Sequence, residues 1–124
     1  MTGSLSLEHG DAMEEMFERG WTDGLPVVPP TPELVQAMLD HAGVVATDVV
    51  GTVPERSRAV TADKAAINAV MAGCRPEYFP VILAALAAML EPVFGAHTVV
   101  TSTGGAALCV VVSMYAAALY VVPS

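Results

Sequence analysis

The sequence predicts a small single α/β domain in which helices pack on a short, mixed sheet that a partner subunit completes. A length of 124 residues gives room for one hydrophobic core. Along the chain, helix start and stop patterns alternate with valine-rich runs that are typical of strands. Hydrophobic residues make up 54% of the chain and charged residues only 15%, which is more apolar surface than one small core can cover. We therefore expect an oligomer.

Residues 1–19 are predicted to hold an N-terminal amphipathic helix. Asp11, followed three residues later by Glu14, resembles a capping box at the start of this helix, and Gly20 ends it. The expected buried face consists of Met13, Met16 and Phe17. Residues 21–30 contain three prolines and a glycine, so we expect an ordered loop there.

Residues 20–124 are predicted to form the single α/β domain. Its first helix, over about 32–42, is framed by Thr31 as the N-cap, Pro32 in the first turn and Gly43 after the end. The remaining expected elements are a strand over 48–53, a loop over 55–58, a helix capped by Thr61 that runs to about 72, a buried helix over 77–90, and strands over 97–101 and 108–112.

The C-terminal segment of this domain is hydrophobic, because no Asp, Glu, Lys or Arg follows Glu91. Residues 106–122 approach the length of a membrane span but lack flanking Lys or Arg, and the β-branched run 109–112 suits a buried strand better. We therefore do not expect a membrane anchor. Part of residues 92–124 is expected to be buried against another chain.

The net charge of −8 and the isoelectric point of about 4.5 argue against nucleic-acid binding and against binding to anionic membranes. Two cysteines without a C-x-x-C spacing fit a reducing cytoplasm, and the first 20 residues do not resemble a signal peptide. The three histidines lie singly, so no metal site is predicted. The sequence identifies no cofactor.

Cys74 lies between two predicted helices, beside Arg75 and directly before the second helix begins. Helix amides and the arginine would stabilise a thiolate there, which makes Cys74 a candidate nucleophile, with Glu77 for proton transfer and Tyr78 as donor to an oxyanion. The alternative is structural: an inert thiol at a helix junction, a first-turn acid and a core aromatic. Cys109 is expected in an apolar strand, so Cys74 should react with thiol reagents first.

A second candidate group would bind the substrate. Arg56, Arg58 and Lys64 follow a predicted strand end and lie around a helix N-terminus, where they would hold a small anion. The alternative is exposed surface charge. Gly104 and Gly105 offer bare backbone amides or a simple turn. The other expected substrate-binding residues are Trp21 and Asp23 at a pocket mouth, together with Asn68 and Arg75.

Two stretches carry a resemblance to a known family. They are Trp21–Val27 followed by Pro29–Thr31, and Asn68–Tyr78. The chain, over about residues 20–112, resembles a bacterial family found fused to or beside UGSC-motif (seleno)proteins, which carry selenocysteine or cysteine followed by Gly-Ser-Cys. That motif is absent from this sequence. The resemblance implies a subunit of a two-component thiol-based enzyme, with a complementary half or a thiol or selenol protein as its partner.

Two classes of function follow. The first is a subunit of a cytoplasmic, thiol-based enzyme complex, lyase-like or redox, that acts on a small anionic molecule through Cys74. The alternative is a noncatalytic binding or scaffolding subunit of a hetero-oligomer. The reactivity of the Cys74 thiol distinguishes them.

Overall fold

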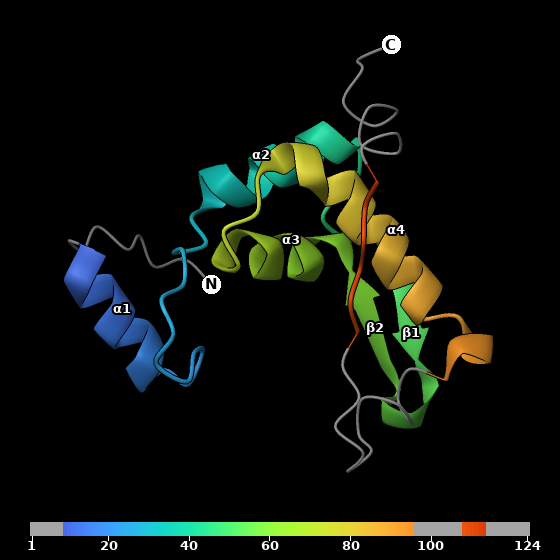
Figure 1. Ribbon diagram of the computed structural model, residues 1–124, viewed down its shortest axis with the longest axis horizontal. Coiled ribbons are helices and arrows are strands. Elements are labelled where there is room, and N and C mark those ends of the chain that lie inside the picture. The colour runs from blue at the N-terminus through green and yellow to red at the C-terminus, as the bar shows by residue number, and fades with distance from the viewer. Residues whose placement is uncertain (1–8, 96–107, 114–124) are drawn as a thin grey trace.

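The computed structural model describes residues 9–95 and 108–113, and these form a small domain of mixed α and β structure (Figure 1). Its α-helices are α1 (His9–Glu18), α2 (Pro32–Ala42), α3 (Ala62–Met71) and α4 (Phe79–Met89). Strands β1 (Val49–Val53) and β2 (Arg58–Thr61) pair antiparallel, and short 3-10 turns occupy η1 (Pro54–Arg56), η2 (Pro76–Tyr78) and η3 (Pro92–Phe94). The sheet in the described residues is therefore antiparallel and not mixed as expected.

Helices α1, α2 and α3 all end in the same way, with a glycine in the left-handed conformation. At the end of α2, for example, Gly43 (φ +66°) donates to the carbonyl of Asp40 and Val44 donates to the carbonyl of Leu39. This pair of bonds is a Schellman motif, which satisfies carbonyls that the helix leaves free. The predicted helix over 32–42 is confirmed at both ends, because Thr31 also accepts from the Leu34 N–H.

The hydrophobic core lies where α2, α3 and α4 pack together. Helix α3 presents four alanines, Ala62, Ala65, Ala66 and Ala69, all of which are buried. Small side chains let the neighbouring helices approach closely, and Met38, Leu39 and Phe79 fill the space between them. Helix α1 stands apart from this group in Figure 1.

The β1–β2 hairpin lies against α4. Val53 pairs with Arg58 next to the η1 turn, and a register irregularity falls between Val49 and Gly51. The strand predicted over 48–53 is confirmed, whereas β2 was expected to be loop and then a helix cap. Strand β2 has only one strongly hydrophobic side chain, Val60. It forms a strand because β1 offers its backbone groups as hydrogen-bond partners.

Other expectations are wrong in detail. Helix α1 includes His9, so Asp11 lies in its first turn and does not cap it. The helix expected over 77–90 begins as an α-helix only at Phe79, and several of its alanines are exposed. Residues 108–112 form no strand and are exposed, so the buried strand predicted there is not found.

The strand expected over 97–101, together with Gly104 and Gly105, lies outside the described residues, as does most of the apolar tail. Within the described ranges, no helix combines the length and the apolar character that crossing a membrane requires.

Candidate functional site

The two stretches that carry the family resemblance meet at the end of α3. The Val28 N–H donates to the carbonyl of Met71 at 3.0 Å, which fastens the proline-rich segment to the last turn of α3. A side chain added at Gly73 would place its Cβ 3.9 Å from Val28 Cγ2, so the two segments lie in van der Waals contact. Segments more than 40 positions apart thus form one surface.

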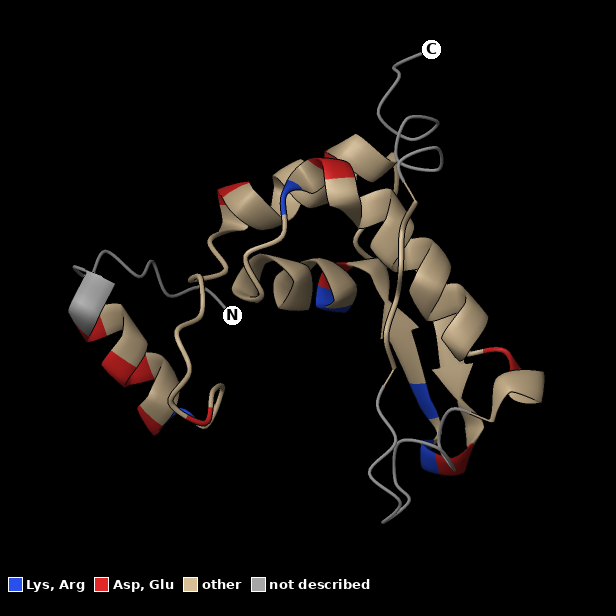
Figure 2. Ribbon diagram, in the orientation of Figure 1, with Lys and Arg blue, Asp and Glu red and all other residues tan. Residues whose placement is uncertain are grey.

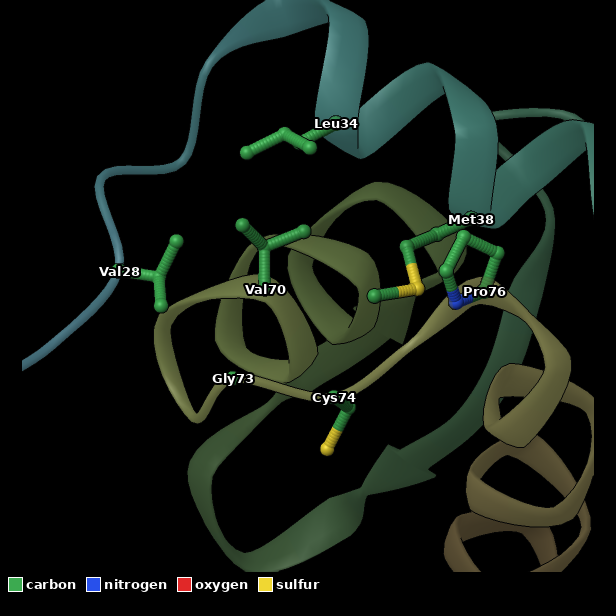
Figure 3. A pocket seen from close by; sticks show the side chains of 7 residues that line it. All are labelled: Val28, Leu34, Met38, Val70, Gly73, Cys74 and Pro76. Atoms are coloured by element: carbon green, nitrogen blue, oxygen red, sulfur yellow. The ribbon is translucent and has the colours of Figure 1, made fainter.

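A pocket of about 110 Å³ opens at this contact (Figure 3). Helix α2 supplies its upper wall in the figure, and Val28, the end of α3 and the loop after α3 supply the rest. The residues that line it are Val28, Leu34, Met38, Val70, Gly73, Cys74 and Pro76. We refer to it as the Cys74 pocket.

The Cys74 pocket is apolar. Its lining holds no charged side chain, and the Cys74 thiol is the only side-chain group in it that is even weakly polar apart from the Met38 thioether. Sites for drug-sized ligands occupy roughly 300–1,000 Å³, whereas a cavity of about 150 Å³ accommodates benzene. The pocket therefore suits one aliphatic side chain or a similarly small apolar group.

The backbone places the residue at position 74 against the end of α3. Gly73 (φ +79°) donates to the carbonyl of Val70 at 2.9 Å, and Cys74 donates to the carbonyl of Ala69 at 3.0 Å, which together make a Schellman motif at the end of α3. The residue after the left-handed glycine in this motif commonly packs back on its helix. Cys74 does so, because it is half-buried against the core. In Figure 3 its thiol points away from Leu34 and Val70.

The groups expected to act with Cys74 do not converge on the pocket. A 3-10 turn, η2, separates Cys74 from α4, so the thiol does not lie directly before an α-helix as predicted. Glu77 and Tyr78 belong to that turn and are exposed, as is Arg75, and none of the three lines the pocket. Tyr78 is therefore not the core aromatic of the structural alternative either.

No family model, curated protein sequence or solved structure matches this chain. Within residues 9–95 and 108–113, no group of three or more His, Cys, Asp or Glu side chains is placed to hold a metal ion.

The basic residues expected to bind an anion are spread over three elements (Figure 2). Arg56 lies in η1, Arg58 begins β2, and Lys64 lies in the first turn of α3. Strand β2 separates the last two, because three steps along a strand span roughly 10 Å. All three side chains are exposed, and none forms an ion pair with another described residue.

The remaining candidates have local roles. Trp21 packs at the end of α1, where the Arg19 guanidinium carbon lies 5.2 Å from its ring centre. Asn68 donates to the carbonyl of Lys64, one turn earlier in α3, at 2.8 Å. Asp23 is exposed. None of these three residues lines the Cys74 pocket.

The residues that do line the pocket were largely missed. Val70, Gly73 and Pro76 lie inside the second stretch that carries the resemblance, and Val28 lies between the two parts of the first stretch. Of the lining residues, only Cys74 is predicted from the sequence to be a functional group. Leu34 and Met38 are four residues apart on α2 and so share one face of the helix. That spacing was the available indication that α2 presents an apolar pair to a neighbour.

Proposed function

We propose that this chain is a noncatalytic binding subunit of a hetero-oligomer and that the Cys74 pocket anchors an apolar side chain of its partner. One observation carries the proposal: the loop at Val28, helix α2 and the end of α3, where the Asn68–Tyr78 stretch lies, come together to build a single apolar pocket. Val28 and Leu34 lie at its rim and remain exposed, so the pocket opens to the surface. Buried apolar anchors in small pockets supply much of the energy of protein interfaces.

The partner we propose is a thiol or selenol protein of the UGSC-motif type. The resemblance of Trp21–Val27 and Asn68–Tyr78 to the associated family supports this choice, and so does the apolar character of the pocket. The proposal includes a cytoplasmic setting, consistent with two free cysteines, and a sheet that another subunit completes. The acidic charge balance does not favour a nucleic-acid partner.

A second candidate is the catalytic one, in which the chain contributes Cys74 to a lyase-like or redox reaction on a small anion. The position of Cys74 in the pocket wall favours this candidate. The outward location of Glu77, Tyr78 and the basic residues gives it less support than the binding role has.

The binding role is tested with a charge placed at the pocket rim. Leu34→Glu puts a carboxylate where the partner's side chain would have to bury it, and an unpaired buried charge strongly opposes association. Titration of the purified chain with a purified UGSC-motif protein should show at least about tenfold weaker binding for this variant. Leu34 is 43% exposed, so the fold should tolerate the change.

Val45→Glu is the matched control, because Val45 is 64% exposed and does not line the pocket. It should bind as the wild type does. Equal affinity of all three proteins, or no binding by the wild type, would contradict the proposed anchor.

Cys74 separates the two candidates. For a binding subunit, Cys74→Ala leaves partner affinity within about threefold of the wild type, because the thiol packs on its own core. In the chain diluted to a monomer, a thiol reagent should then modify exposed Cys109 before half-buried Cys74, the reverse of the order expected from the sequence. Rapid modification of Cys74 near neutral pH that the partner blocks would instead support the catalytic role.

A further inference from the structure

We propose that residues 108–112 of one copy add as a third strand to the β1–β2 sheet of a second copy, and that the second copy returns the same strand. The inference rests on that part of the proposed function which assigns completion of the sheet to another subunit, and it identifies that subunit as a second copy of this chain. It concerns a different surface from the Cys74 pocket.

The proposed strand is exposed and extended. Residues Leu108, Cys109, Val110, Val111 and Val112 are all exposed, with Val111 at 86%. Their backbone N–H and C=O groups form no hydrogen bond within the described part of the chain. Figure 1 shows them as a nearly straight segment. Three consecutive valines favour strand geometry, and a charge-free exposed segment of this kind readily adds to a sheet edge.

The acceptor is the β1–β2 hairpin. In the described residues it is a sheet of two strands, so the outer edge of each strand has no paired neighbour. Helix α4 already lies against the hairpin, and Leu90 at its end contacts Gly51 closely. Two-stranded sheets are marginally stable, and a third strand with a covered face gives independent stability. Strand β1 is five residues long, which matches the length of 108–112.

Symmetry favours a second copy as the partner, and the charge of the pairing surfaces does not oppose it. The whole chain carries −8, which opposes self-association in general. The hairpin and its turn, residues 49–61, hold one acid, Glu55, and two bases, Arg56 and Arg58, for a local balance of +1. The donated strand carries no charge. If each copy gives residues 108–112 to the hairpin of the other, both hairpins gain a third strand and the assembly closes as a twofold dimer.

The test uses the full chain and variants that block pairing. Val110→Pro removes an N–H from the ladder, and Val111→Lys places a charge on the donated strand. Light scattering coupled to size exclusion, over a range of micromolar concentrations, should show a dimer for the wild type. Both variants should weaken dimerisation at least about tenfold. Val93→Lys is the matched control, because Val93 is 96% exposed, lies outside the segment and should leave the dimer intact.

Hydrogen exchange supplies the second readout. The amides of residues 108–112 should be protected in the wild type and unprotected in Val110→Pro, while the melting temperature of each variant reports whether it folds. A wild-type monomer at every concentration, a dimer that neither variant weakens, or protected amides in a monomer would each overturn the exchange. The Leu34→Glu variant should still dimerise, so loss of the pocket anchor and loss of strand exchange are observed separately.

Discussion

Asp63 shows how a single residue fixes the start of α3. The Thr61 hydroxyl donates to Asp63 Oδ1, and the Lys64 N–H donates to the same oxygen at 2.8 Å. The Thr61 bond, supported by the backbone bond and by the charge of Lys64, holds the pKa of Asp63 below its usual value, although partial burial opposes this shift. The sequence predicted Thr61 as the cap position. It did not predict that the Thr61 hydroxyl donates to the Asp63 carboxylate. Asp63, and not Thr61, therefore accepts the hydrogen bond from the Lys64 N–H at the start of α3.

This lowered pKa makes the stability of α3 depend on pH. A group whose pKa is lower in the folded state stabilises the fold above its unfolded pKa, and this contribution is lost as the pH falls through the folded pKa. We expect Asp63→Asn to cost about 0.5–1 kcal/mol near neutral pH. The difference from the wild type should shrink as the pH falls below about 4.

Urea unfolding across pH 3–7 measures this effect. Asp23→Asn is the control, because exposed Asp23 accepts no hydrogen bond from the described residues and its substitution should have little effect at any pH. A constant cost of Asp63→Asn across the range would show that the carboxylate charge has no part in capping α3.

Among the elements, those defined by local chemistry were predicted best. Helix α2 has its cap, its proline and its terminal glycine within its own sequence, and the structure confirms its bounds. Strand β2 and the turn η2 were missed, because the first depends on pairing with β1 and the second on packing against α2. Residues 108–112 were placed in a buried strand on composition alone, which cannot show whether a neighbouring strand is available.

The end of α3 offers a test of how much a helix terminus contributes. Gly73→Ala should destabilise the fold by about 1–2 kcal/mol, because φ is +79° and a side chain opposes that conformation. The added Cβ would meet Val28 only at 3.9 Å, so no steric clash contributes. Gly73→Asn should cost less, since Asn tolerates the left-handed region. Urea unfolding of both variants measures the difference, and an equal cost would assign the effect to packing.

The contact between α4 and β1 limits the size of the residue at position 51. A Cβ on Gly51 would lie 2.7 Å from both Cβ and Cδ1 of Leu90, which is too close for any side chain without movement of the helix end. Gly51→Ala should therefore cost about 1–3 kcal/mol in urea unfolding. Thr52→Ala, at the next and exposed position, should cost much less. A neutral Gly51→Ala would mean that α4 moves away freely.

At the scale of the whole molecule, the sequence predicted that Cys74 lies in a functional site, but it did not predict the pocket that surrounds this residue. The Asn68–Tyr78 stretch, which supplies four of the lining residues of the Cys74 pocket, was noticed, but the pocket also depends on helix α2 and on a contact between Val28 and the end of α3 that no local pattern encodes. The anion site stays a prediction, because Arg58 and Lys64 are close in sequence but β2 extends between them.

Among the helices that the structure describes, α1 is the least tied to the core. Figure 2 shows it as an acidic helix apart from the other elements. Its buried residues, Ala12 and Met16, do not belong to the cluster that α2, α3 and α4 share. Its expected core face is correspondingly incomplete, because Met13 and Phe17 are exposed. The interpretation of residues 1–19 as a separate helical unit remains a prediction that can be measured.

Local opening of α1 should therefore cost less free energy than unfolding of the core. In native-state hydrogen exchange, we expect the α1 amides to exchange at least about tenfold faster than those in the middle of α3, whose alanines are buried between neighbouring helices. Gly20→Ala should speed exchange in α1 further, since φ is +70° at the end of this helix, and leave α3 unchanged. Equal protection of α1 and α3, lost together at one denaturant concentration, would instead show that α1 unfolds as part of the core.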